Sequence, residues 1–142
     1  MQTDYFNPHI HFRCNMFGNM FKQSLKDGLD SKTFIKDVMT NKDYDFMFIT
    51  YACQEWSDDA FMYSVIKNKT KCKKGKTLDS YILWFAGYLY RYWMETRNMD
   101  RKDIYKILPI EKLLNGFDFY HTQDWDYIIN DVSNSQQLVN NS

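Results

Sequence analysis

The stretch DSYILWFAGYLYRYWMETRN, residues 79–98, decides the fold because it reads as a single helix that is apolar nearly all round. It contains seven aromatic rings, and its apolar residues recur at helical spacing over far more than one face. Thr77 or Asp79 can cap its start, and Asn98 breaks the pattern. Such a helix must be buried on several sides. We therefore predict an all-α fold, a small single-domain helical bundle around a central aromatic helix at residues 79–97.

Three residues of this helix have predicted structural roles. Glycine inside a helix costs about 1 kcal/mol relative to alanine, so Gly87 suggests that another backbone crosses closely there. Arg91 stands between two tyrosines, and a buried guanidinium must stack on rings or pair with a carboxylate. We expect its partner in the region 118–126. Trp93 falls on the apolar stripe and should belong to the core.

Shorter segments on both sides have the same helical period. Apolar residues recur at spacings of three and four in residues 16–29 and 32–41. Residues 100–108 and 109–116 begin with Asp and Pro, which favour the first positions of a helix. Residues 44–51 are ambiguous, since they fit a buried strand as well as a helix, and we favour a helix followed by a second one that SDDA at 57–60 would cap.

The 142 residues suffice for one domain with a core of its own. Residues 1–15 show no helical or strand period and contain the turn signal Asn7-Pro8, so we predict an N-terminal arm. The helical domain should span residues 16–133. The polar residues 134–142 should form a frayed tail.

Composition favours a folded cytoplasmic protein. Aromatic residues make up 18% of the chain and charged residues 25%, and eighteen basic side chains balance eighteen acidic ones. Three cysteines form no C-x-x-C pair and are odd in number, which argues against a secreted disulfide framework. No signal peptide is visible, and the longest apolar run is too short for a membrane span.

The strongest local charge is the run KNKTKCKKGK at residues 67–76, which we predict to be a loop exposed to solvent. It could hold an acidic partner or a phosphate backbone, although it has no interleaved aromatic residue and no phosphate-binding glycine pattern. Its six lysines are Lys67, Lys69, Lys71, Lys73, Lys74 and Lys76.

Three groups of residues were considered as chemical sites. His9, His11 and Cys14 are suitable metal donors, but a fourth ligand at a recognisable spacing is missing, so we predict no metal site. No histidine near the other two cysteines, Cys53 and Cys72, could generate a thiolate nucleophile. No pattern indicates a cofactor.

His121 is the third candidate, because Asp118, Asp124 and Asp126 lie near it in the sequence and histidine titrates near neutral pH. We favour a structural role for this cluster. Thr122 should be the N-cap of the last helix, with Asp124 in the favourable first turn.

The C-terminal half resembles a known family. The ordered set LWFAGYLYRYW, DRKDIYKIL and LLNGFDFYHTQDWDYIINDV, within residues 79–132, is similar to small uncharacterised domains found mainly in Firmicutes. That family resembles antitoxins encoded beside ADP-ribosyltransferase-like proteins. The resemblance implies a class of protein with a protein partner, possibly such a toxin, and implies no mechanism.

The surplus of tyrosine, phenylalanine and tryptophan indicates that some rings face a partner. We expect Tyr88, Tyr92, Tyr120 and Trp125 to be exposed and to bind it. The function predicted from the sequence is therefore a non-catalytic antitoxin-like or immunity-like binding module. Two alternatives stay open, an enzyme that acts on a nucleotide or ADP-ribose through the His121 cluster and a nucleic-acid-binding regulator that uses the lysine run.

Overall fold

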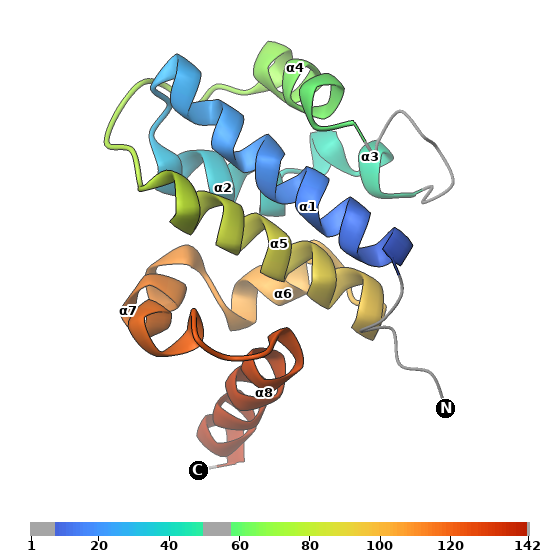
Figure 1. Ribbon diagram of the computed structural model, residues 1–142, viewed down its shortest axis with the longest axis vertical. Helices are drawn as coiled ribbons and strands as arrows, with labels where there is room; N and C mark the ends of the chain where they lie inside the picture. Colours follow the sequence, from blue (N-terminus) through green and yellow to red (C-terminus); the bar gives the residue numbers. More distant parts are fainter. Residues whose placement is uncertain (1–7, 50–57, 142) are drawn as a thin grey trace.

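The computed structural model describes residues 8–49 and 58–141, and within these ranges the chain is a helical bundle (Figure 1). The α-helices are α1 (Pro8–Gln23), α2 (Ser31–Thr40), α3 (Phe46–Ile49), α4 (Asp59–Lys69), α5 (Ser80–Arg97), α6 (Arg101–Ile107), α7 (Ile110–Tyr120) and α8 (Trp125–Asn141). Two short 3-10 helices, η2 (Ser24–Asp27) and η3 (Lys42–Tyr44), connect the early helices. The predicted all-α class is confirmed.

Helix α5 is the axis of the bundle, as predicted. Asp79 caps its start by accepting a hydrogen bond from the backbone N–H of Tyr81, and Asn98 ends it in the left-handed conformation with φ of 50°. Helix α1 runs beside α5 in the opposite direction, while α6 and α8 cover its other side (Figure 1). Every residue from Phe85 to Met94 is buried, which explains why the sequence is apolar nearly all round.

The helices α1 and α5 cross where each has a glycine. A Cβ added at Gly87 would lie 2.7 Å from the Cα of Gly18 and 2.9 Å from the carbonyl oxygen of Phe17. A Cβ added at Gly18 would in turn lie 2.7 Å from the carbonyl oxygen of Trp84. The two backbones therefore touch, and the predicted close crossing at Gly87 is confirmed.

Arg91 is buried as predicted, but its partner is not in the region 118–126. Its Nε donates to Glu95 Oε2 at 2.7 Å, one turn further along α5, and its guanidinium lies 5.8 Å from the ring centroid of Phe17. Arg13 of α1 also donates to Glu95, from Nε at 2.8 Å. The residue that pairs with the later region is Arg97, whose side chain lies 2.7 Å from Asp126.

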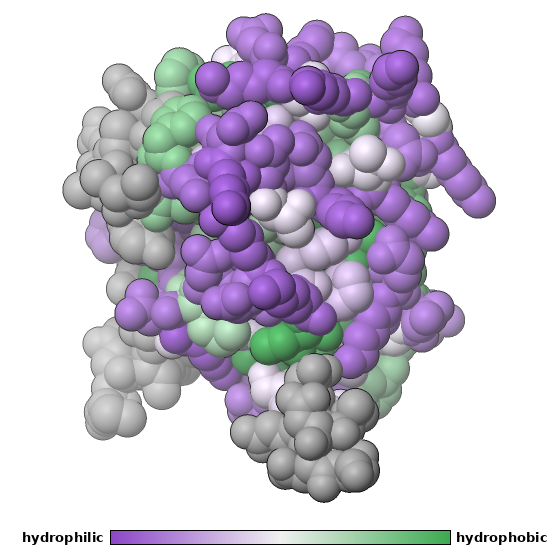
Figure 2. Space-filling model, turned by 180° about the vertical axis from the view of Figure 1, so that it is seen from behind, coloured by the Kyte–Doolittle hydropathy of each residue, from purple (hydrophilic) through white to green (hydrophobic). Residues whose placement is uncertain are grey.

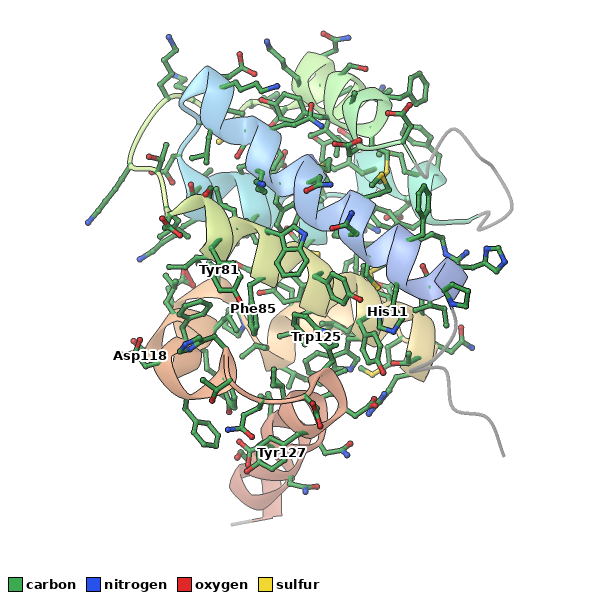
Figure 3. The ribbon with its side chains drawn as sticks, in the orientation of Figure 1. His11, Tyr81, Phe85, Asp118, Trp125 and Tyr127 are labelled. Atoms are coloured by element: carbon green, nitrogen blue, oxygen red, sulfur yellow. The ribbon has the colours of Figure 1, made fainter. Side chains whose placement is uncertain are left out.

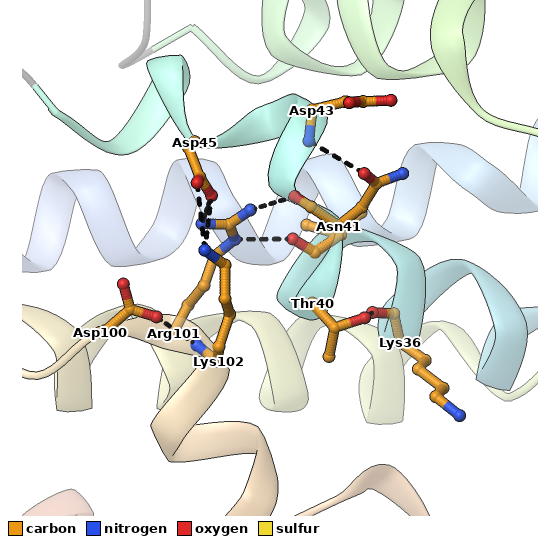
Figure 4. A network of polar contacts seen from close by, with 9 residues as sticks. Lys36, Thr40, Asn41, Asp43, Asp45, Asp100, Arg101 and Lys102 are labelled. Atoms are coloured by element: carbon orange, nitrogen blue, oxygen red, sulfur yellow. Dashed lines mark hydrogen bonds and ion pairs between the residues drawn. The ribbon is translucent and has the colours of Figure 1, made fainter.

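A second buried arginine joins α6 to the end of α2 (Figure 4). The side chain of Arg101 is 2% exposed. Its Nε donates to the carbonyl oxygen of Val38 at 2.9 Å, and one terminal nitrogen donates to the carbonyl oxygen of Asn41. Its other terminal nitrogen donates to Asp45 at 2.8 Å. Lys102 and Arg101 hold the pKa of the Asp45 carboxyl below its usual range.

Two predicted boundaries are wrong. The arm expected at residues 1–15 is helical from Pro8 onward, because Ile10, Cys14 and Phe17 form a buried stripe of α1. The tail expected from residue 134 is also helical, because α8 continues to Asn141. Residues 1–7 lie outside the described residues.

The ambiguous segment is helical where it is described. Residues 46–49 form α3, and Asp58 caps α4 by accepting a hydrogen bond from the N–H of Phe61 at 3.1 Å. Tyr44 ends η3, and Thr50 and Tyr51 of that segment, like Cys53 after it, lie outside the described residues. Among the described residues, no helix is long and apolar enough to cross a membrane.

Candidate functional site

A pocket of about 430 Å³ opens between α1, α5 and the turn that connects α7 to α8. We call it the aromatic pocket. Figure 3 shows that His11, Phe85 and Trp125 approach one another from three different helices, with Tyr81 near the start of α5. The lining residues are His11, Tyr81, Trp84, Phe85, His121, Gln123, Asp124 and Trp125.

Helix α5 supplies one wall. Tyr81, Trp84 and Phe85 are three and four residues apart and therefore share a face of the helix. The rings of Tyr81 and Trp84 stack with centroids 6.0 Å apart. Trp84 Nε1 donates to Asn15 Oδ1 of α1 at 2.9 Å, which fixes the indole ring and satisfies its only donor.

The opposite wall begins with Trp125, the first residue of α8. Its ring stacks on Tyr88 at a centroid distance of 4.5 Å and lies 4.9 Å from the ring of Phe85. The hydroxyl of Tyr88 forms a hydrogen bond with His11 Nδ1. A chain of contacts thus connects α1, α5 and α8 beneath the pocket.

The turn between α7 and α8 completes the pocket. His121 Nδ1 lies 2.9 Å from the carbonyl oxygen of Phe117, and since a carbonyl can only accept, this nitrogen must carry the proton. The Thr122 hydroxyl donates to the carbonyl oxygen of Phe119 at 2.9 Å. Thr122 thus follows His121, the C-cap of α7, and since α8 begins at Trp125, the prediction that Thr122 is the N-cap of α8 is wrong. Asp124 directly precedes α8, and its backbone carbonyl accepts the N–H of Ile128.

The candidate acid/base cluster around His121, for which we favoured a structural role, is not assembled. Asp118 lies on the outer side of α7, away from the pocket (Figure 3). Asp126 accepts hydrogen bonds from Arg97 at 2.7 Å and from the hydroxyl of Tyr92 at 3.0 Å. Among the described residues, His121 forms no hydrogen bond or ion pair with a carboxylate. Asp124 is the one carboxylate of the cluster that shares the pocket with His121.

The candidate metal ligands are also apart. His11 lines the aromatic pocket, whereas Cys14 is fully buried in the core. Burial raises the pKa of the Cys14 thiol, and the neighbouring Glu95 raises it further. Within residues 8–49 and 58–141, no three His, Cys, Asp or Glu side chains come together in a way that could hold a metal ion.

Two of the four rings expected to bind a partner are buried. Tyr88 and Tyr92 face the core, because α5 is enclosed on nearly every side, so the prediction that they are exposed is wrong. Tyr120 and Trp125 are half-buried. The Tyr120 hydroxyl donates to Asp131 at 2.9 Å, and burial together with this hydrogen bond raises its pKa to about 12.

Exposed rings lie nearby on the same helices. Tyr81, Phe119 and Tyr127 are 47%, 51% and 47% exposed. Phe119 packs against both Tyr120 and Tyr127, with centroid distances of 5.6 and 6.1 Å. We call these three exposed rings, together with Tyr120 and Trp125, the aromatic face. Their exposure depends on the orientation of α7 and α8, for which the sequence holds no signal.

The predicted lysine run is exposed, but it starts on a helix. Lys67 and Lys69 occupy the last turn of α4, and the loop proper begins at the C-cap Thr70. The loop backbone is held against the start of α2, since Lys73 and Lys76 accept hydrogen bonds through their carbonyls from the N–H groups of residues 30 and 31.

This pairing adds two further lysines, Lys26 and Lys32, to the same end of the molecule. Both are exposed and lie next to the segment 27–31 that binds the loop. Asp27 within that segment pairs with Lys67 at 2.9 Å. We call this group the lysine end; its members are Lys26, Lys32, Lys67, Lys71, Lys73, Lys74 and Lys76.

The view from behind shows mostly hydrophilic side chains over the face opposite that of Figure 1 (Figure 2).

Comparisons with models of protein families, with curated proteins and with solved structures found no match to this chain.

Proposed function

We propose that this chain is a non-catalytic protein-binding module of the cytoplasm, an antitoxin-like or immunity-like partner of a toxin or effector, and that it binds through the aromatic face. The observation that carries the proposal is the exposure of Tyr81, which lines the pocket, and of Phe119 and Tyr127, which contact each other on α7 and α8. Exposed aromatic clusters rimmed by polar side chains are typical of protein interaction sites. Tyrosine and tryptophan are also the residues that most often dominate binding energy.

The core explains why these rings are available for binding. The aromatic side chains of α5 already fill the centre of the bundle, from Phe85 to Trp93. The exposed rings Tyr81, Phe119 and Tyr127 are therefore additional to those that fill the core, whereas the half-buried rings Tyr120 and Trp125 also pack against it. Removing one of the exposed rings should weaken binding without unfolding the protein, which separates this proposal from a structural role.

The choice of a toxin as the partner rests on the resemblance of residues 79–132 to antitoxin-like domains. An ADP-ribosyltransferase-like protein is accordingly the first partner to test. His121, Thr122 and Asp124 fall within that stretch and form the turn that carries one wall of the pocket. In this proposal they form the turn between α7 and α8, and no proton transfer is assigned to them.

The test begins with tagged full-length chain purified from its native host, with co-purifying proteins identified by mass spectrometry. A captured protein supports the proposal only if it inhibits growth or modifies a substrate when expressed alone and the chain stops this effect. The proposal is overturned if the chain binds no such protein. It is also overturned if the chain neutralises the captured protein equally well after Phe119→Ala, Tyr127→Ala and Tyr81→Ala are combined.

A second candidate function is binding of nucleic acid by the lysine end. Seven exposed lysines gather there, and Asp27 is engaged by Lys67 and by the hydroxyl of Tyr63. Such a cluster attracts phosphate backbones, with an affinity that falls as salt is raised. Reversing the charge of Lys71, Lys73 and Lys74 should abolish salt-dependent binding of a DNA duplex if this candidate is correct. Binding that is absent in the unmodified chain at low salt excludes it.

A further inference from the structure

Four aromatic residues, Tyr81, Trp84, Phe85 and Trp125, line the aromatic pocket from α5 and α8. The ring planes of Trp84 and Trp125 meet at 62° with centroids 6.3 Å apart, and Phe85 packs between α5 and α8 with only 2% of its surface exposed. Tyr81 extends the wall toward solvent. The face of an aromatic ring carries negative potential, so several faces around one volume favour a positively charged group.

The charges around the pocket have the sign that a cation requires. The lining includes Asp124 and neither lysine nor arginine. The helices and turn that form this side, residues 110–132, carry five carboxylates and a single lysine, Lys112. The five are Glu111, Asp118, Asp124, Asp126 and Asp131. Of these, Asp124 lines the pocket, whereas Asp118 lies away from it, Asp126 is paired with Arg97 and Asp131 accepts a hydrogen bond from Tyr120. A ligand phosphate would be repelled here, which argues against a nucleotide.

The polar atoms at the rim are mostly acceptors. In the tautomer that carries its proton on Nδ1, which is bound to the Phe117 carbonyl, Nε2 of His121 is an acceptor. The amide nitrogen of Gln123 donates to Thr122 Oγ1 at 3.2 Å, which leaves the amide oxygen of Gln123 to accept. The Asp124 carboxylate is exposed. A ligand with N–H donors and a positive charge would satisfy all three.

We propose that the aromatic pocket binds the ammonium or guanidinium group of a lysine or arginine side chain presented by the partner protein. This inference rests on the proposed function for the source of the side chain, but the chemistry of the pocket can be tested without any partner. The aliphatic stem of such a side chain would pack on Tyr81 and Trp84 while its charged end lies near Trp125 and Asp124.

The experiment is an NMR titration of the full chain, read at the indole N–H signals of Trp84 and Trp125. The probes are N-acetyl-arginine amide and N-acetyl-lysine amide, each paired with a neutral analogue of similar shape, the citrulline and norleucine amides. We expect the charged probes to shift both signals and to bind about tenfold more tightly than the neutral ones. The signal of Trp93, which is fully buried, should not move.

Variants assign the binding to the pocket. Asp124→Asn and Tyr81→Ala change exposed side chains, so both should fold, and each should weaken the charged probes about threefold or more. Phe61→Ala on α4, a ring that is 40% exposed outside the pocket, is the matched control and should change nothing. Equal affinity for charged and neutral probes, or loss of binding in the Phe61 variant alone, would overturn the proposal.

The same variants separate this inference from the proposed function. If the charged probes bind but Asp124→Asn leaves the affinity for the partner unchanged, the pocket binds a small organic cation from solution, and the assignment to a partner side chain is wrong. If the partner binds through the aromatic face but no charged probe shifts the tryptophans, the proposed function stands and the pocket inference fails.

Discussion

Gly87→Ala is the sharpest test of the fold, because it adds one methyl group at the crossing of α1 and α5. In an exposed helix the change would stabilise the protein by about 1 kcal/mol. At Gly87 the new Cβ would lie 2.7 Å from the Cα of Gly18 and 2.9 Å from the carbonyl oxygen of Phe17, where ordinary contacts exceed 3.4 Å. Both neighbours are backbone atoms, which cannot rotate away. The two central helices would have to separate by several tenths of an ångström.

Overpacking of this kind costs about 1 to 3 kcal/mol. Because the clashing atoms belong to the backbone, we expect the upper part of this range, about 2 to 3 kcal/mol, from which the gain in helix propensity of about 1 kcal/mol is subtracted. We therefore expect a net loss of about 1 to 2 kcal/mol, which corresponds to a fall in melting temperature of about 3 to 8 °C for a chain of this length. Differential scanning calorimetry and urea unfolding followed by circular dichroism would both report this change.

Gly116→Ala is the matched control, since it also lies inside a helix, α7. The atoms nearest its Cβ would belong to the ring of Tyr120, the first at 2.6 Å, and this half-buried side chain can move at the cost of its hydrogen bond to Asp131, which offsets the gain in helix propensity. We expect its melting temperature to stay close to that of the unmodified chain. A Gly87→Ala variant that is as stable as the Gly116→Ala variant would refute the close crossing of α1 and α5.

Three further predictions concern buried polar groups. Arg101→Met should lower the free energy of unfolding by about 2 to 4 kcal/mol in urea titrations, because two backbone carbonyls lose their donor; a loss below about 0.5 kcal/mol would contradict this. Burial raises the pKa of Glu95, but the hydrogen bonds and charges of Arg13 and Arg91 outweigh it and the net pKa is lowered. The ionised Glu95 therefore stabilises the fold above its unfolded pKa of about 4.3, and this contribution disappears as pH falls through the lower folded pKa. Glu95→Gln should accordingly reduce the dependence of the free energy of unfolding on pH in the acidic range. Iodoacetamide should modify Cys14 only after unfolding, as peptide mass mapping would show, since burial disfavours its thiolate; native labelling at the unfolded rate would be inconsistent with its position.

The sequence predicted those features that depend on a single helix. The period of residues 80–97 and the glycine within it are sufficient to predict a buried axis and a close crossing, because both follow from the surface that one helix must cover. Asp79, Asp58 and Asp100 cap helices as expected, since a cap depends only on its own turn.

Features that depend on the packing of several helices were not predictable. Tyr88 and Tyr92 could not be identified as buried, because their burial is produced by α1 and α8 together. The pairing of Arg91 with Glu95 has a signal in the sequence, an opposite charge at i+4, which predicts this contact better than the distant partner expected in the region 118–126. For α1 the signal was the spacing of Ile10, Cys14 and Phe17, which the turn interpretation of Pro8 obscured.

The aromatic pocket also depends on the packing of several helices and was therefore not predictable from the sequence. It combines residues of α1, α5 and the α7–α8 turn that lie more than one hundred positions apart in the sequence, from His11 to Trp125. Of its eight lining residues, Trp125, His121 and Asp124 were predicted to have a role. The contribution of Trp84 and Tyr81 follows only from the orientation of α5 within the bundle.

The most direct test of the central claim is isothermal titration calorimetry of the chain against the toxin that it captures, with one variant of the aromatic face and one of the pocket histidine. Phe119→Ala or Tyr127→Ala should weaken binding by about 2 kcal/mol or more, roughly thirtyfold, whereas His121→Ala should leave neutralisation largely intact. If His121→Ala abolishes activity while both ring variants bind like the unmodified chain, the protein is an enzyme and the binding-module account is wrong.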